Sequence, residues 1–173
     1  MIISLIGYRG TGKTTVGRLM AEQLAIPFLD SDQQIVERAG RSIAQIFESE
    51  GESTFRDLES EVCSEMMQRH SAVLSWGGGV ILRENNRQAI SGSNITFWLQ
   101  ATEGTIFHRI HGDSRSKENR PALTELDPLQ EIRTNLEHRR AFYDECCDHV
   151  IATDSLSPAQ VADSLLKWIN RQP

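Results

Sequence analysis

Short apolar runs alternate with longer amphipathic stretches along most of the chain. The short runs predict five β-strands, at Ile2–Ile6, Pro27–Asp30, Val73–Trp76, Ile95–Leu99 and His149–Ala152. Between the runs, apolar residues recur at helical spacing, as in the stripe Val16, Leu19, Met20 and Leu24. This alternation predicts a three-layer α/β fold, in which a five-stranded parallel sheet carries helices on both faces.

Capping residues predict where several helices begin and end. Ser42 and Gln45 have capping-box spacing ahead of a helix over Ile43–Glu50, and Gly51 is placed to end that helix. Another helix follows, with an apolar stripe at Phe55, Leu58, Val62 and Met66. Ser157 predicts the N-cap of the last helix.

Length and charge narrow the class of protein. The chain has 173 residues and a formal net charge of −6, which favours one domain over residues 1–173 and argues against a general nucleic-acid surface. No apolar run is long enough to cross a membrane, and the N-terminus lacks the pattern of a signal peptide. The three cysteines form neither a disulfide framework nor a metal-spaced cluster. We therefore expect a cytoplasmic monomer with no nucleic-acid or membrane partner.

A glycine-rich motif follows the first predicted strand and precedes the first predicted helix. It reads Gly7-Tyr8-Arg9-Gly10-Thr11-Gly12-Lys13-Thr14. In this position the pattern is typical of a P-loop, whose bare glycines let backbone N–H groups surround phosphate oxygens at the start of a helix. The lysine reaches the β- and γ-phosphates, and the threonine hydroxyl is suited to Mg²⁺. The motif predicts a nucleoside triphosphate but not the acceptor of the phosphate.

Two carboxylates stand at the end of the second predicted strand. Asp30 and Asp32 lie at the edge of the sheet where open parallel sheets bind ligands. One carboxylate is suited to organising Mg²⁺ and its waters, and the other to accepting a hydroxyl proton. The alternative is that one of the two aspartates, for example Asp32, merely caps the following helix.

Arginines and glycines elsewhere are suited to a small anionic ligand. Arg56 and Glu59 are spaced i, i+3 on one helix face, so the glutamate can hold the arginine as a fork for a carboxylate, although a surface ion pair is the alternative. Three consecutive glycines after the third strand, Gly77–Gly79, permit close approach of a ligand. Arg139 and Arg140, on the helix with Leu129, Ile132 and Leu136, are ambiguous as a pair. The polar, aperiodic segment 111–122 is a natural mobile lid.

Taken together, these motifs resemble the shikimate kinase family of small P-loop kinases over the whole chain. Besides the P-loop, the matching residues are Phe28-Leu29-Asp30-Ser31-Asp32, Gly51-Glu52, Phe55-Arg56, Glu59, Gly77-Gly78-Gly79, Arg120-Pro121 and Arg140-Ala141-Phe142-Tyr143. The resemblance implies ATP-dependent phosphorylation of the 3-hydroxyl of shikimate, with Mg²⁺ as cofactor. Another metabolite kinase, similar to gluconate kinases, and a catalytically silent nucleotide-binding module are the alternatives.

The resemblance also implies a role for each matching residue. The ATP-binding residues would be Gly10, Thr11, Gly12, Lys13, Thr14, Thr15, Arg109 and Arg120, with Thr14 and Asp30 at the metal. The substrate-binding residues would be Asp32, Arg56 and Glu59, within a substrate-binding segment of about 30–60, together with Gly77, Gly78, Gly79 and Arg140. The catalytic residues would be Lys13, Asp32 and Arg120, with Asp32 as the base. Arg115 competes with Arg120 for the lid role, and Trp76 either packs in the core or narrows the site.

Overall fold

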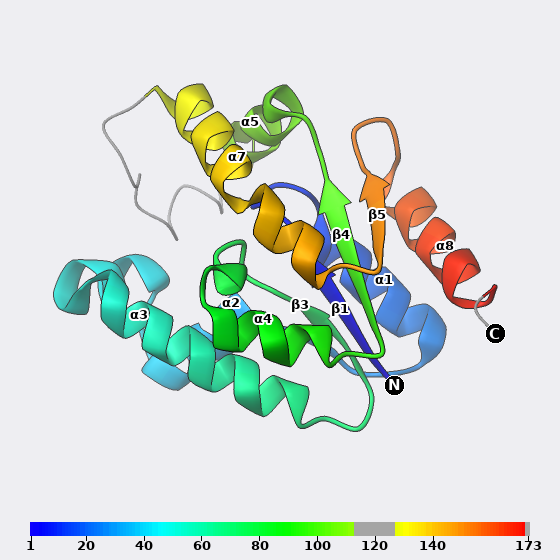
Figure 1. Ribbon diagram of the computed structural model, residues 1–173, viewed down its shortest axis with the longest axis horizontal. Coiled ribbons are helices and arrows are strands. Elements are labelled where there is room, and N and C mark those ends of the chain that lie inside the picture. Colours follow the sequence, from blue (N-terminus) through cyan, green and yellow to red (C-terminus); the bar gives the residue numbers. More distant parts are fainter. Residues whose placement is uncertain (113–126, 172–173) are drawn as a thin grey trace.

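Five parallel strands form the central sheet of the protein in a computed structural model, which describes residues 1–112 and 127–171 (Figure 1). In sequence order the strands are β1 (Ile2–Ile6), β2 (Phe28–Asp30), β3 (Ala72–Ser75), β4 (Ile95–Gln100) and β5 (His149–Ala152). In space they lie in the order β2-β3-β1-β4-β5. Each predicted strand is present with its ends within one residue, so the predicted parallel sheet is confirmed.

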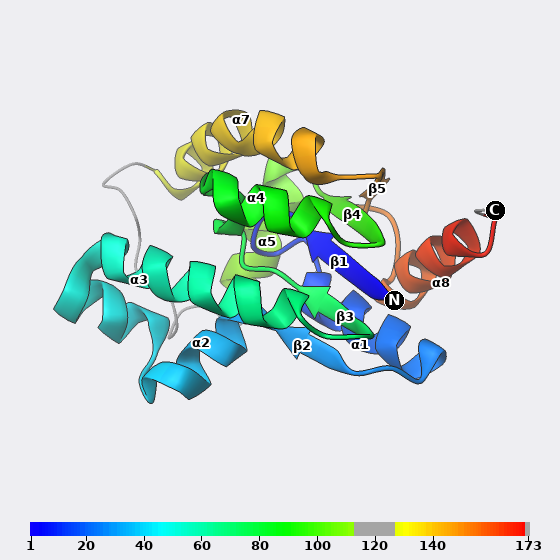
Figure 2. The same ribbon diagram turned by 60° about the horizontal axis from the view of Figure 1, so that its bottom comes forward.

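Helices cover both faces of this sheet (Figures 1 and 2). One face packs against α1 (Lys13–Leu24) and α8 (Pro158–Ile169), and the other against α3 (Ile43–Met67), α4 (Glu84–Ser91) and α7 (Pro128–Cys146). The remaining helical elements are α2 (Ser31–Ala39), the 3-10 helix η1 (Val80–Leu82) and α5 (Glu103–Gly112). The three-layer α/β architecture predicted from the sequence is therefore confirmed.

Side-chain alternation along the strands builds one core on each face. In β1, Ile3 and Leu5 belong to the core under α1 and α8, whereas Ile2 and Ile6 belong to the core on the opposite face. This is the period of two that a strand imposes. Trp76 is buried, and its indole N–H donates to Ser4 Oγ at 2.9 Å. Trp76 therefore packs in the core rather than narrowing a ligand site.

The predicted caps form, and they fix the entry of α3 and α8. Ser42 and Gln45 make the reciprocal hydrogen bonds of a capping box, and Ser157 does the same with Gln160. Gly51 adopts φ 82° and ψ 174° and kinks α3, so the two helices predicted on either side of it run on as one bent element. The kink sets the direction from which the second half of α3 approaches the sheet edge.

Two further predictions, on membrane helices and on the lid, are compared here with the described residues. Within residues 1–112 and 127–171, no helix is both long and apolar enough to cross a membrane. The predicted lid over 111–122 falls mostly outside the described residues, as do Arg115 and Arg120.

Candidate active site

The P-loop joins β1 to α1 and is held by hydrogen bonds between its own residues. Gly7, Gly10 and Gly12 all have positive φ, at 141°, 79° and 94°, a region that side chains with a Cβ rarely adopt. Lys13 is buried, and its ammonium donates to the carbonyls of Gly7 at 2.8 Å and Tyr8 at 2.9 Å. The loop thus presents backbone N–H groups at a helix N-terminus together with a fixed cation, which is an arrangement suited to phosphate.

The two aspartates after β2 have different partners. The Thr14 hydroxyl donates to Asp30 Oδ2 at 2.8 Å, and Asp30 Oδ1 accepts the N–H of Asp32 at 3.1 Å and of Gln33 at 3.4 Å. Asp30 is therefore the N-cap of α2 as well as the partner of Thr14. One of the two aspartates does cap the following helix, as the alternative allowed, but it is Asp30 and not Asp32. The Asp32 carboxylate lines a pocket.

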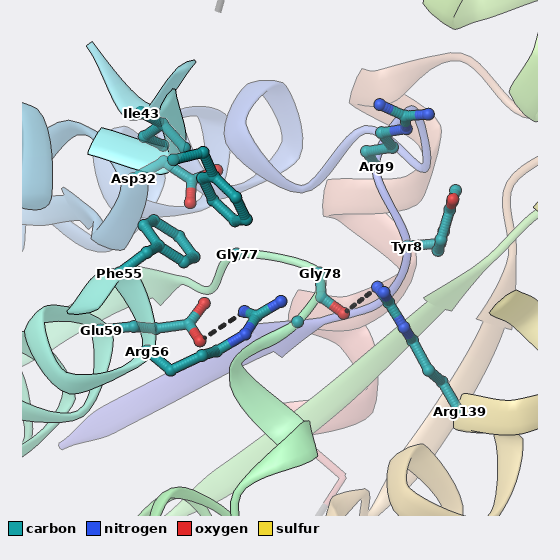
Figure 3. A pocket seen from close by; sticks show the side chains of 12 residues that line it. Tyr8, Arg9, Asp32, Ile43, Phe55, Arg56, Glu59, Gly77, Gly78 and Arg139 are labelled. Carbon is teal, nitrogen blue, oxygen red and sulfur yellow. Dashed lines mark hydrogen bonds and ion pairs between the residues drawn. The ribbon is translucent and has the colours of Figure 1, made fainter. Parts of the chain in front are cut away.

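That pocket lies beside the P-loop, at the ends of β1, β2 and β3 (Figure 3). It brings together Asp32, Arg56, Glu59 and the three glycines that the sequence singled out. Its complete lining is Tyr8, Arg9, Asp32, Ile43, Phe47, Phe55, Arg56, Glu59, Gly77, Gly78, Gly79 and Arg139. Residues from α2, α3, α7 and two loops therefore converge on one cavity next to the phosphate-binding backbone.

Two glutamates hold Arg56 in this pocket. Its guanidinium donates to Glu59 Oε2 at 2.7 Å, and to Glu52 Oε1 from Nη2 at 3.0 Å and from Nε at 3.2 Å. Glu59 is 1% exposed, and this burial raises its pKa above the usual value, while the neighbouring Arg56 acts in the opposite direction. The pair is thus a buried part of the pocket and not the surface ion pair that was the alternative.

The three glycines let other side chains approach the backbone. A Cβ on Gly77 would lie 2.6 Å from Asp32 Oδ1, and a Cβ on Gly79 would overlap the Arg56 guanidinium. A Cβ on Gly78 would lie 3.3 Å from the backbone nitrogen of Arg9, so Gly78 packs against the P-loop itself. The glycines therefore make room for the pocket's charged groups and fix its distance from the P-loop.

The structure places Arg139, and not the predicted Arg140, in the pocket. Arg139 is 8% exposed and donates to the Gly78 carbonyl at 3.0 Å and to Asn135 Oδ1 at 3.3 Å. Tyr143 Oη donates to the same carbonyl at 2.7 Å. Arg140 is exposed and lies beside β4 in a separate hollow that includes Trp98 and Arg133.

The choice between these two arginines depends on which face of α7 turns inward. Successive helical residues differ by about 100°, so only one of them can face the pocket. Leu129 and Leu136 suggest a face that suits Arg140, but Leu129 is 36% exposed. The buried residues Ile132, Tyr143 and Cys146 define a face on which Arg139 lies. That second pattern was a signal in the sequence that could have identified Arg139.

Other lining residues were not predicted from the sequence as part of a binding site. Phe47 and Phe55 form an apolar wall, with ring centroids 4.8 Å apart, and Ile43 extends it. Tyr8 and Arg9 occupy P-loop positions at which the motif allows any residue. Their side chains line the pocket only because α7 and β3 bring their partners to that point.

Arg109, which the sequence predicted near the adenine, lies on α5 beside the P-loop. It donates to the Gly10 carbonyl at 3.2 Å, to Thr153 Oγ1 at 3.0 Å and to the Thr153 carbonyl at 2.8 Å. It therefore ties the P-loop to the segment after β5. Thr15 is exposed at the start of α1, next to Thr14.

A parallel sheet with a P-loop and an adjacent charged pocket defines a small-molecule kinase of the P-loop class. A model of the family described as "Shikimate kinase" matches residues 9–170. The chain belongs to the shikimate kinase family.

Curated relatives agree over nearly the whole length. The shikimate kinase of Thermodesulfovibrio yellowstonii is 37% identical, with 98% of this chain and 95% of the relative covered. The shikimate kinase of Symbiobacterium thermophilum is 38% identical, with 99% and 98% covered.

Solved structures extend the likeness to three dimensions. A structure of shikimate kinase from Acinetobacter baumannii in complex with shikimate has a TM-score of 0.92 and 37% identity, and covers 99% of this chain and 95% of that chain. A gluconokinase from Sinorhizobium meliloti shares only the fold, with a TM-score of 0.57, 17% identity, and 98% and 91% coverage.

Proposed function

We propose that this enzyme transfers the γ-phosphoryl group of ATP to the 3-hydroxyl of shikimate, giving shikimate 3-phosphate and ADP in aromatic biosynthesis. The observation that carries this proposal is the pocket in which Asp32, Arg56 and Arg139 surround a space next to the P-loop. Shikimate is a small carboxylic acid with vicinal hydroxyls. The arginines suit its carboxylate, and the aspartate suits its hydroxyls.

Charge balance assigns the carboxylate anchors. Arg56 already pairs with Glu59 and Glu52, whereas no carboxylate among the described residues forms an ion pair with Arg139. A desolvated guanidinium without a carboxylate is a strong site for an anion. Arg139 is therefore the main anchor, and Arg56, oriented by Glu59, is the second. This assignment replaces Arg140 in the set of substrate-binding residues.

Asp32 is the general base and the hydroxyl ligand of the acceptor. Its carboxylate lies against Gly77, where only a glycine permits the approach, and it lines the pocket. From there it accepts the proton of the attacking hydroxyl. The P-loop fixes the γ-phosphate in line with that oxygen, and positioning of this kind supplies much of the rate in phosphoryl transfer.

The Lys13 ammonium and the N–H groups of Gly10 through Thr15 hold the transferring phosphate and disperse its charge. Arg109 holds the P-loop from the adenine side through the Gly10 carbonyl. Arg120, outside the described residues, stays a prediction as the third catalytic residue.

The oxygen donors at the start of α1 fit a hard divalent cation. Thr14 Oγ1 and Asp30 Oδ2 lie 2.8 Å apart beside the P-loop, and hydroxyl and carboxylate oxygens are what Mg²⁺ selects. Thr14 would bind the ion directly, and Asp30 would hold its waters. When bound, Mg²⁺ neutralises charge on the nucleotide phosphates.

A coupled assay of ADP formation tests the proposal with three acceptors: shikimate, gluconate and water alone. We expect rapid turnover only with shikimate, and a phosphorus NMR spectrum of the product that places the phosphate on the 3-hydroxyl. Turnover with gluconate would identify the other metabolite kinase. Nucleotide binding without turnover would identify a silent module.

A further inference from the structure

An ion pair joins the P-loop to α7, two segments that are far apart in the sequence. Arg9 Nη2 donates to Glu131 Oε1 at 3.2 Å, between residues 122 positions apart. The Glu131 side chain, in the first turn of α7, is 5% exposed, and that of Arg9 is 23% exposed. Removing one partner of a buried pair leaves an uncompensated charge. The pair, called here the latch, therefore constrains the P-loop and α7 to a matched position.

The two ends of the latch lie on different structural elements, the P-loop and α7. The backbone of Arg9 is part of the P-loop. Its side chain lines the pocket beside the P-loop that we propose binds shikimate, called here the acceptor pocket. Glu131 lies two turns of α7 before Arg139, the anchor proposed for the acceptor carboxylate. Figure 3 shows Arg9, Tyr8 and Arg139 gathered at one end of this pocket. The latch thus connects the phosphate-binding backbone to the helix that carries the anchor.

Tyr8 provides a second connection beside the latch. The guanidinium carbons of Arg9 and Arg139 lie 5.9 Å and 5.5 Å from the centroid of its ring, which is within the range of a cation–π contact. The Tyr8 carbonyl accepts a hydrogen bond from Lys13 at 2.9 Å. A phosphate that accepts a hydrogen bond from the Lys13 ammonium would compete with the Tyr8 carbonyl for that donor. Tyr8 is the residue directly before Arg9.

We propose that the Arg9–Glu131 latch couples nucleotide binding to acceptor binding. Phosphate in the P-loop shifts the backbone that carries Arg9, and the latch transmits that shift to α7 and so to Arg139. By thermodynamic linkage, binding of the acceptor then raises the affinity for the nucleotide by the same factor. Arg9 and Glu131 act here as positioning residues. The inference rests on the proposed function, since it takes shikimate as the acceptor.

Isothermal titration of shikimate, without and with saturating ADP, measures the coupling as a ratio of dissociation constants. For the wild-type enzyme we expect ADP to tighten shikimate binding about fivefold or more, the lower range for such couplings. The double variant Arg9→Met/Glu131→Met replaces the buried pair with apolar side chains, a change that often leaves stability intact. We expect this variant to bind each ligand alone, with a coupling ratio near one.

Single variants and a matched control separate the latch from general effects. Arg9→Met and Glu131→Gln should each lower the coupling ratio at least threefold. Glu103→Gln breaks the exposed ion pair between Glu103 and Arg133, which joins α5 to the same helix at 3.0 Å, and should leave the ratio unchanged. Thermal unfolding checks that each variant is folded.

Several outcomes would overturn the inference. Undiminished coupling in the folded double variant would do so, as would equal loss in Glu103→Gln. A wild-type enzyme that phosphorylates shikimate without any coupling would refute the latch while leaving the proposed function intact. A wild-type enzyme that neither binds nor phosphorylates shikimate would instead refute the proposed function, and the inference with it.

Discussion

The P-loop and the acceptor pocket lie side by side, but the chain builds them in different ways. The P-loop is made by consecutive residues. Of its internal hydrogen bonds, the one with the largest sequence separation joins Lys13 to Gly7, six positions apart. The acceptor pocket depends on contacts such as that of Arg139 with Gly78, which spans 61 positions. Local geometry thus defines the phosphate site, whereas the packing of distant elements defines the acceptor site.

The two regions also recognise ligands through different groups. The P-loop uses backbone N–H groups and one lysine, which suit any phosphate chain. The acceptor pocket presents charged side chains, among them Asp32, Arg56 and Arg139, which we propose recognise one small acid. Substitutions in the P-loop should therefore affect every reaction of the nucleotide, while substitutions in the pocket should affect one acceptor selectively.

The largest effect should come from Lys13→Ala. Loss of the Lys13 ammonium, which we propose holds the transferring phosphate, should lower kcat by about 10³-fold or more, measured by ADP release with saturating shikimate. Because Lys13 also binds the carbonyls of Gly7 and Tyr8, thermal unfolding must show that the loop change has not unfolded the protein. A folded variant with nearly normal kcat would contradict the P-loop assignment.

Asp32→Asn should have the next largest effect. Removing a positioned base lowers rates by about 10²–10⁴-fold, and the amide keeps the shape of the side chain against Gly77. We expect the loss in kcat for shikimate, with little change in the binding of ADP measured by titration. If kcat and KM both change less than threefold, Asp32 is not the base.

The two neighbouring arginines of α7 offer a matched comparison. Arg139→Ala should weaken shikimate binding by about 2 kcal/mol or more, which is roughly 30-fold, because it removes one partner of a desolvated charge pair. Arg140→Ala removes an exposed charge and should change binding less than threefold. Titration of shikimate into both variants checks this. Equal losses in the two, or equal losses for shikimate and ADP, would contradict the anchor assignment.

The sequence predicted the parts of the protein that depend on local patterns. The five strands, the capping box of α3, the N-cap Ser157 of α8 and an interruption of the helix at Gly51 follow from periodicity and from the hydrogen bonding of single residues, although the helix bends at Gly51 where the sequence predicted an end. Asp32 and the glycines Gly77–Gly79 reach one pocket because the parallel strands β2 and β3 place their carboxyl ends at one edge of the sheet. Topology therefore made part of the acceptor site predictable.

The remaining parts of the site depend on how α7 packs. Its inward face is set by Ile132 and Tyr143. The residue pattern left Arg139 and Arg140 ambiguous, and Arg140 was chosen from the family resemblance alone. The contact of Arg9 with Glu131 joins residues 122 positions apart, which no local pattern encodes. The sequence could identify these residue types but could not select among them without the tertiary contacts.

The smallest predicted effect is a pH dependence that should appear in the acceptor pocket but not in the P-loop. The pKa of Glu59 is raised by burial, so on acidification Glu59 takes up a proton at a higher pH than an exposed glutamate does. Protonation weakens its hold on Arg56, and KM for shikimate should therefore rise as the pH falls through that pKa. The KM for ATP should not follow this profile.

Stability supplies an independent readout of the same group. Between the unfolded and the raised folded pKa, the folded protein binds more protons, so the contribution of Glu59 to stability falls as the pH rises through this window. Glu59→Gln should remove both this slope in the thermal midpoint and the acidic rise in KM, at the cost of a somewhat higher KM at neutral pH. If Glu59→Gln keeps the wild-type pH profile of KM, another group controls Arg56, and the buried glutamate serves packing alone.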